Sequence, residues 1–269
     1  MIELTQFREY MELQDLSQGT IEDYLFEMKK VPEYLEDQRK YLVTNRGKRM
    51  LISAYRKYLR FQKSIGKINA EQLLDLLDTF KLPKKRGKTK KATWYPQEDW
   101  GNVLLSLPNR CAKMAAYIQL QFGLRVGEVS HLRAKEDIDF ENMYVHIQAR
   151  PGWHPKHKRD RSVPMLKNQA NIFQRWIKTI PAEITNGYLL WSNRVKERVK
   201  ERSIQRWYHK ANIRSHDLRR SFAKVLYYNS DKNVKLVSDL LGHANIATTS
   251  VYLGLESEEV REGYEKAMS

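Results

Sequence analysis

The fold is best predicted from two neighbouring stretches, SHDLRRSFAKVLYYN at residues 215–229 and KLVSDLLGHANIATTSVYLG at residues 235–254. In the first stretch, Ser215 is a good helix N-cap. A helix that begins there places His216 and Arg219 three residues apart, on one face of its first turns. The first stretch therefore predicts a helix that presents a histidine and an arginine together.

The second stretch predicts another helix, because its apolar residues repeat with helical spacing and end at a glycine, Gly242. His243 then lies just past the helix end, and Tyr252 follows nine residues later. Upstream, FGLRVGEVSHLR at residues 122–133 places Arg125 directly after a helix that ends at a glycine. Two arginines, two histidines and a tyrosine are the candidates for one site.

The rest of the chain is mostly helical in pattern, with one pair of strands. Residues 143–148 alternate between apolar and polar, and 161–165 could form the partner strand, with a basic hairpin loop between them. We therefore expect a mainly α fold with a small antiparallel β-sheet (α+β). The further expected helices are 20–31, which Thr20 caps and Pro32 ends, 48–62, 70–80, 96–107, 111–122, 167–179, 195–210, 215–228, 234–241 and 257–268.

The amino-acid composition excludes several classes of protein and indicates a kind of partner. The 269 residues include 48 Lys+Arg and 32 Asp+Glu, for a net charge of +16 and a single cysteine, Cys111. One cysteine excludes an internal disulfide framework, and the chain has no long apolar run of the kind that crosses a membrane or directs secretion. A basic chain of this type indicates a polyanionic partner, most often nucleic acid, and a cytoplasmic location.

The charge is concentrated in the middle of the chain. Residues 38–91 hold 17 basic and 3 acidic side chains, and the densest run is KLPKKRGKTKKAT at residues 81–93. This run repels itself and lacks apolar periodicity, so we predict a helical domain at 1–80, a basic linker at 81–93 and a second domain at 94–269. The linker is either a solvated hinge or a hinge that lies along a phosphate backbone.

Together these motifs resemble the tyrosine recombinases, or phage integrase family, which includes Xer-type recombinases and archaeal virus and plasmid integrases. The resemblance rests on GLRVGEVSHLR, HDLRRSFA and LLGHANIATTSVYLG in that order, and it covers residues 93–269. It implies a two-domain, C-shaped clamp. A helical, SAM-like core-binding domain would contact DNA from one side, and a catalytic domain with a C-terminal tail helix from the other.

The resemblance also implies a role for each catalytic residue. Tyr252 would attack a DNA phosphate to form a 3′-phosphotyrosyl bond, which keeps the bond energy for religation. Arg125 and Arg219 would hold the non-bridging phosphate oxygens, since guanidinium groups match phosphate geometry. His216 and His243 would add hydrogen bonds to the phosphate, and His216 would assist deprotonation of the tyrosine.

Two further catalytic assignments follow from the resemblance. Glu128 would orient the neighbouring catalytic groups. The general acid of the family is a lysine on a β-hairpin, and counting back from KRDRSVP at residues 158–164 selects Lys156, with Lys158 as the alternative. No metal and no cofactor are expected. His154 and His157 in the same loop would contact DNA or solvent rather than a metal.

The remaining basic residues are candidates for contacts with the DNA backbone. Arg220 is a rival to Arg219 by spacing from His216, but the family pattern takes the first arginine, which leaves Arg220 to meet a phosphate or an acid. The candidate DNA-binding residues are Arg46, Lys48, Arg49, Lys84, Lys85, Arg86, Lys88, Lys158, Arg159, Arg161 and Arg220.

The predicted function is that of a site-specific DNA recombinase or integrase. Its partners would be double-stranded DNA with a specific recombination site and three further copies of the chain, as a homotetramer on two duplexes, with a monomer free in solution and no membrane. The tail at 257–268 would dock on its own domain or on a neighbouring protomer. The alternatives are a catalytically silent DNA-binding relative and a relaxing type IB topoisomerase.

Overall fold

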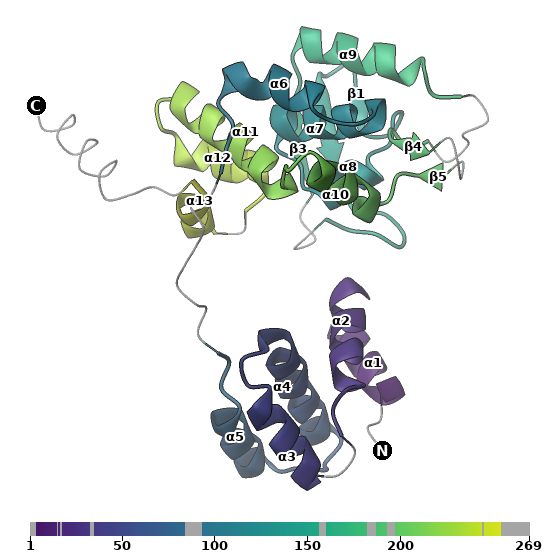
Figure 1. The fold of residues 1–269 in the computed structure, drawn as a ribbon. Coiled ribbons are helices and arrows are strands. Elements are labelled where there is room, and N and C mark those ends of the chain that lie inside the picture. Colours follow the sequence, from purple (N-terminus) through teal and green to yellow (C-terminus); the bar gives the residue numbers. More distant parts are fainter. Residues whose placement is uncertain are drawn as a thin grey trace, which may run out of the picture. The chain divides into compact units, whose positions relative to one another are not determined.

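The computed structural model describes residues 4–14, 16, 18–32, 35–83, 93–155, 160–181, 187–192, 197–243 and 245–253. The chain divides into two compact units, residues 1–89 and 90–269 (Figure 1). This division falls inside the predicted linker. Because residues 84–92 lie outside the described part, the role of the linker stays a prediction.

The first unit is helical throughout its described residues. Its helices are α1 (Leu4–Leu13), α2 (Gln18–Met28), α3 (Leu35–Thr44), α4 (Arg49–Ser64) and α5 (Ala70–Thr79). The sequence predicted α4 and α5 to within two residues, and α2 begins two residues before the expected cap at Thr20. Helices α1 and α3 were not predicted.

Helix α4 is the centre of this unit because its apolar residues recur every three or four positions and so form one buried face. It packs against α1, α2 and α5. Phe7 of α1 meets Tyr58 and Phe61 of α4, with ring centroids 5.3 and 5.6 Å apart. Arg56 of α4 donates to the carbonyls of Leu77 and Phe80, which satisfies the open C-terminal end of α5.

The second unit has short strands between many helices. The elements are a 3-10 turn η1 (Gln97–Asp99), α6 (Trp100–Leu105), α7 (Arg110–Phe122), α8 (Val126–His131), β1 (Ile138–Asp139), β2 (Tyr144–Ile147), β3 (Arg161–Pro164), α9 (Lys167–Ile177), β4 (Trp191–Ser192), β5 (Glu197–Arg198), α10 (Glu201–Lys210), α11 (Ser215–Asn229), α12 (Val234–Leu241) and α13 (Ile246–Leu253). The mainly α fold with small antiparallel sheets is confirmed.

The larger sheet has the order β1-β2-β3, and all of its neighbours are antiparallel. The predicted pairing of β2 with β3 is confirmed, with Val145 opposite Val163 and Ile147 opposite Arg161. Val145, Ile147 and Val163 are buried, so this face of the sheet covers the core and Arg161 begins its strand directly beside that core.

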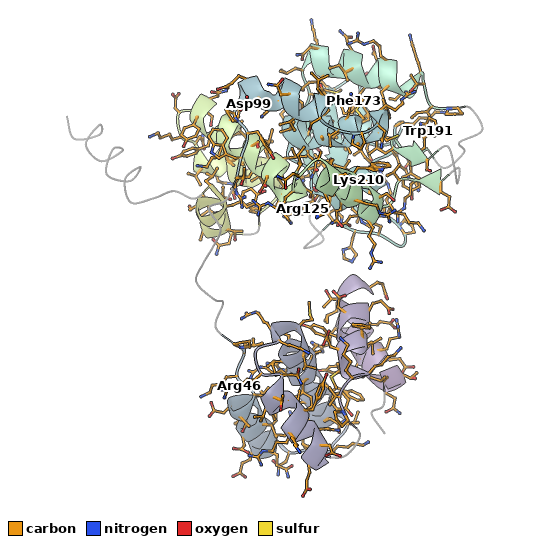
Figure 2. The ribbon with its side chains drawn as sticks, viewed as in Figure 1. Arg46, Asp99, Arg125, Phe173, Trp191 and Lys210 are labelled. Carbon is orange, nitrogen blue, oxygen red and sulfur yellow. The ribbon has the colours of Figure 1, made fainter. Side chains whose placement is uncertain are left out.

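Helix α7 forms the middle of the second unit and packs against α6, α8, α10 and α11. Phe122 and Tyr117 of α7 meet Phe173 of α9, whose side chain is fully buried. Figure 2 labels Phe173. A smaller apolar cluster joins α11, α12 and α13 through Phe222, Leu241 and Leu253. Figure 1 shows these three helices grouped at one end of the unit.

Some expected elements differ from the observed ones. The helix expected at 195–210 begins only at Glu201, because residues 197–198 pair with β4 as strand β5. Ser215 is the first helical residue of α11 rather than its cap, which is Arg214. The tail helix expected at 257–268 lies outside the described residues. Within the described part, no helix is both long and apolar enough to span a bilayer.

Candidate active site

Helix α11 carries His216, Arg219 and Arg220 in its first two turns. Leu218, on the opposite face, is fully buried in the main core and fixes the rotation of the helix. The predicted helix is confirmed. His216 is exposed to solvent, while Arg219, one turn later, is only 2% exposed. The arginine lies at the base of the site and the histidine at its mouth.

Arg125 reaches the site because α7 ends at a glycine. Gly123 has φ +63, a left-handed conformation that reverses the chain, and a Cβ there would lie 2.3 Å from Cδ1 of Phe222. Arg125 is then the extended N-cap residue of α8, and its backbone N–H donates to Glu128 at 2.7 Å. Figure 2 shows Arg125 near the edge of the unit, between α13 and α10.

Glu128 lies among three arginines. Arg125 Nη1 donates to its carboxylate at 3.0 Å, Arg161 donates with two nitrogens at 3.0 and 2.7 Å, and Arg219 Nη1 is 3.7 Å away. Burial alone would raise the pKa of Glu128, but the hydrogen bonds and charge of Arg161, with the charges of Arg219 and Arg125, lower it to about 2. Glu128 therefore stays ionised and orients the guanidinium groups.

Arg219 is held by the ends of two helices. Its Nη1 donates to the carbonyl of Gly123 at 2.6 Å and its Nη2 to the carbonyl of Leu241 at 2.7 Å. These carbonyls terminate α7 and α12, where helix ends carry partial negative charge. Burial, followed by the charge of Arg125, lowers the pKa of Arg219, and the carbonyls with Glu128 compensate its buried charge.

His243 follows α12 where Gly242 ends the helix with φ +65. The His243 Nδ1 atom is 2.8 Å from Oγ1 of Thr249, and its Nε2 atom is 3.4 Å from Nη2 of Arg219. The hydroxyl of Thr249, which is fully buried in α13, thus fixes the orientation of the imidazole ring. His243 links the arginine of α11 to the helix that carries Tyr252.

Tyr252 lies in the last turn of α13 beside the other candidates. Its ring is 5.5 Å from that of His243 at an interplanar angle of 80°, and its hydroxyl donates to the backbone carbonyl of His216 at 3.2 Å. Burial raises the pKa of Tyr252 above its usual value of 10.0, and the charges of Arg219, Arg220 and Arg125 oppose that rise. The hydroxyl is therefore protonated at neutral pH, next to cations that stabilise its anion.

A pocket of about 280 Å³ opens next to these residues. Arg125, Glu128, His216 and Arg219 line it, together with His154 from the β2–β3 connection. Partial burial, then the charges of Arg219, Arg220 and Arg125, lower the pKa of His216, and Asp217 opposes them. At neutral pH the pocket therefore combines arginine cations with a neutral histidine, a combination suited to a phosphodiester anion.

The structure brings together six of the predicted residues: Arg125, Glu128, His216, Arg219, His243 and Tyr252. Arg46, Lys48 and Arg49 are exposed in the first unit, around the turn that leads into α4. The predicted residues that lie outside the described part are Lys84, Lys85, Arg86, Lys88, Lys156, His157, Lys158 and Arg159.

Arg161 corrects one prediction. The sequence places it among the DNA contacts, but its side chain is only 7% exposed. It donates to Glu128 with two nitrogens and to the carbonyl of Leu240 with Nε at 3.0 Å. The structure therefore does not support Arg161 as a DNA contact, because its guanidinium is occupied inside the domain.

Sequence reasoning also missed supporting residues. In the sequence Thr249 reads only as a helix-forming, cap-like residue, and no local signal predicted its contact with His243. The exposed basic residues of α10, Arg202, Arg206 and Lys210, were not singled out either. In the described ranges, no three His, Cys, Asp or Glu side chains are grouped closely enough to hold a metal ion.

Comparisons with known proteins identify the family. The model of the phage integrase family matches residues 102–259. Tyrosine recombinase XerA of Pyrococcus horikoshii is 25% identical over 284 residues, which cover 98% of this chain and 93% of that protein.

Solved structures share the fold. The Tn1549 transposon integrase in complex with transposon right end DNA aligns with a TM-score of 0.68 and 18% identity over the whole of both chains. A lambda integrase tetramer bound to a Holliday junction aligns with a TM-score of 0.65 and 15% identity, over 94% of this chain and 77% of that one.

The family match covers more than half of the chain, so the chain belongs to the phage integrase family. Its enzyme type is the tyrosine-type site-specific recombinase.

Proposed function

We propose that the chain cleaves and rejoins DNA at a specific site through a 3′-phosphotyrosyl bond to Tyr252. The observation that carries this proposal is the position of the Tyr252 hydroxyl, 3.2 Å from the His216 carbonyl, on a ring that packs against His243. Two buried or half-buried arginines, Arg219 and Arg125, lie in the same cluster. A tyrosine among such groups is suited to nucleophilic attack on a phosphodiester.

In the proposed reaction, the Tyr252 oxygen attacks the scissile phosphorus while the bond from phosphorus to the 5′ oxygen breaks. The tyrosine proton passes to a base, for which His216 is the candidate because its lowered pKa leaves it neutral at pH 7. The hydroxyl must first release the His216 carbonyl, which has no capacity to take the proton. Attack by a free 5′-hydroxyl on the phosphotyrosine reverses the step without ATP.

Arg125 and Arg219 stabilise the extra charge on the non-bridging oxygens during the reaction. Their positions are set before DNA binds, because Glu128 holds Arg125 and two helix-end carbonyls hold Arg219. A cation that is already in place does not have to move when charge develops on the phosphate, whereas water molecules would have to reorient. This is the main reason why such a site stabilises the transition state better than water does.

The departing 5′ oxygen needs a proton, and we assign its donor to Lys156, with Lys158 as the alternative. His154, two residues before Lys156, lines the pocket, which supports an approach of this loop to the phosphate. A substrate with a 5′-bridging phosphorothioate separates the two lysines, because its better leaving group needs no acid. Lys156→Ala should be rescued by this substrate and Lys158→Ala should not.

DNA is the proposed partner of both units. In the first unit, Arg46, Lys48 and Arg49 are exposed, and Arg46 and Arg49 line a groove of about 850 Å³ beside residues 79–83 (Figure 2 labels Arg46). The basic run at 84–88 follows directly. Neutralising phosphates with such side chains releases counterions and gives salt-sensitive affinity. In the second unit Lys158, Arg159 and the exposed basic residues of α10 are candidates for the same role.

We further propose that four copies act together on two duplexes, with a monomer free in solution and a DNA-associated, cytoplasmic location. The solved lambda integrase tetramer on a Holliday junction supports the assembly. Each copy would use its own tyrosine, because Tyr252 lies among the Arg219 and His243 of the same chain. Mixing Tyr252→Phe with Arg219→Ala protein tests this: cleavage in cis predicts no recovery of activity.

The test of the function is a nicked suicide substrate that carries the cognate site, assayed for a covalent complex of protein and DNA. The wild-type protein should form the complex and Tyr252→Phe should not, while Tyr144→Phe, an exposed tyrosine of β2, serves as the control. DNA binding without any covalent complex would instead indicate a silent relative. Relaxation of supercoils without strand exchange would indicate a topoisomerase.

A further inference from the structure

We propose that Arg220 is a positioning residue for the nucleophile: it fixes the end of α13 that carries Tyr252 onto α11, the helix that carries His216 and Arg219. This inference rests on the proposed function of Tyr252. It gives Arg220 a role inside the site, whereas the sequence left it to meet a phosphate or an acid.

Three interactions define the role. Arg220 Nε donates to the backbone carbonyl of Tyr252 at 3.2 Å, and the guanidinium carbon lies over the Tyr252 ring, 5.0 Å from its centroid. Arg220 Nη1 donates to Oδ1 of Asp217 at 3.3 Å. One guanidinium therefore holds the main chain and covers the ring of the nucleophile while a carboxylate orients it.

The carbonyl that Arg220 holds belongs to the last turn of a helix. The helix is α13, whose described residues end at Leu253, and Arg220 reaches its main chain from α11. Arg220 thus holds the main chain of Tyr252 against α11, the helix that also carries His216 and Arg219.

Asp217 fixes the arginine in turn. Its side chain is 5% exposed, and its second oxygen accepts from Nε of Arg214 at 2.8 Å. The planar fork of an arginine can serve Asp217 and the Tyr252 carbonyl at once while it stacks on the ring. The single ammonium group of a lysine does not reproduce this arrangement, so Arg220→Lys should behave as a loss of function.

The experiment compares Arg220→Gln with a matched control, Lys224→Gln. Lys224 lies one turn later on α11 and carries the same charge, but its ammonium group lies over the rings of Trp94 and Tyr228, at 5.5 and 5.9 Å. The measurements are the single-turnover rate of covalent attachment at saturating suicide substrate, and the DNA affinity across a range of salt concentrations.

We expect Arg220→Gln to slow covalent attachment about ten- to a hundred-fold, the effect of losing a charged hydrogen bond. Its DNA affinity and the dependence of that affinity on salt should match those of Lys224→Gln. The opposite pattern, a wild-type rate at saturation with weakened binding and a salt slope reduced by about one, would make Arg220 a phosphate contact and overturn the proposal.

A second readout needs no DNA. With 3-fluorotyrosine at position 252, the ¹⁹F resonance reports the surroundings of the ring. Arg220→Gln should shift it and Lys224→Gln should not, and an unchanged resonance in Arg220→Gln would overturn the proposal. If the wild-type protein forms no covalent complex but the resonance shifts, the proposed reaction fails and the interaction between Arg220 and Tyr252 stands.

Circular dichroism establishes that each variant is folded. If Arg220→Gln does not fold, the same measurements are made on Arg220→Lys and Asp217→Asn, because both variants keep a positive charge at position 220. Slower attachment at unchanged DNA affinity in these variants supports the positioning role. Wild-type attachment rates in both would exclude it.

Discussion

Glu128 controls the electrostatics of the site because its buried carboxylate contacts Arg125, Arg161 and Arg219. The sequence assigned Glu128 an orienting role through the motif around Arg125. It did not reveal Arg161, whose partners lie 33 and 79 positions away along the chain. A motif reports local spacing, whereas an ion pair between a strand and a helix depends on how the chain folds back.

Replacing Glu128 by Gln should destabilise the protein by about 3 kcal/mol, because it leaves three clustered arginines without their counter-charge. Urea unfolding at pH 7 measures this loss. Glu136→Gln is the control, since Glu136 pairs with Arg133 at the surface and is half exposed, so its loss should cost less than about 1 kcal/mol.

The effect of Glu128 should also depend on pH in a defined direction. The pKa of Glu128 is lowered from its usual 4.5 to about 2, so its stabilising contribution is complete above pH 4.5 and is lost as pH falls through about 2. The difference in unfolding free energy between wild type and Glu128→Gln should therefore shrink over this range. A constant difference down to pH 2 would contradict the ionised state of Glu128.

His216 should determine how the rate of covalent attachment falls on the acidic side of its pH profile. Its pKa is lowered from 6.5 by partial burial and by the charges of Arg219, Arg220 and Arg125, against the opposing charge of Asp217. The neutral, proton-accepting form therefore persists below pH 6.5, and the single-turnover attachment rate should fall only below that value. Two results would show that His216 is not the base. One is a midpoint above pH 6.5 in the fall of the attachment rate, and the other is the same fall of the rate in His216→Gln.

At the scale of elements, two glycines bring the site together. Gly123 ends α7 and leads to Arg125, and Gly242 ends α12 and leads to His243. The sequence predicted both helix ends, because glycine is the common residue at a left-handed C-terminus. It did not show that a Cβ at Gly242 would lie 2.9 Å from Cδ of Arg161, an approach between segments far apart in the chain.

Gly123→Ala should destabilise the protein by about 2 to 4 kcal/mol, the sum of left-handed strain and overpacking against Phe222. Gly66→Ala is the matched control, since Gly66 has φ +75 but no atom within 4 Å of an added Cβ, and it should cost only about 1 to 2 kcal/mol. Thermal and urea unfolding measure both. Equal losses would show that the packing against Phe222 relaxes freely.

Helices with long apolar stripes were predictable from sequence, and short elements were not. Helices α4, α5, α7 and α12 agree with the expected ranges to within two residues. The short helix α8 and the two-residue strands carry too few residues for a period to be visible. Strand β5 exists only because it pairs with β4, so its sequence was read as the start of α10.

At the scale of the whole molecule, the excess charge is divided between the two units and the run that joins them. Each unit has its own apolar core, around α4 in the first and around α7 in the second. Among the described residues few basic side chains are buried, so most of these are available to a polyanion. Affinity for DNA should therefore depend steeply on salt.

Neutralising Lys84, Lys85, Arg86 and Lys88 together to Gln tests the role of this run. If it lies along a phosphate backbone, the slope of log affinity against log salt should fall by about 0.9 for each phosphate that the run no longer neutralises. Fluorescence anisotropy across a salt series measures the slope. Lys135→Gln with Lys178→Gln, two exposed lysines of the second unit, is the control, and an unchanged slope in the fourfold variant would favour a solvated hinge.

Periodicity and motif spacing are local properties, so the sequence alone was enough to predict the helical class, the helix ends at glycine, the charge division and the six candidate residues that the structure brings together. The tertiary structure decided how those residues act on one another. It placed Arg161 inside on Glu128, and it set the Tyr252 hydroxyl on the His216 carbonyl with Arg220 across its ring. These interactions join segments far apart in the chain, and their distances follow from packing rather than from spacing in the sequence.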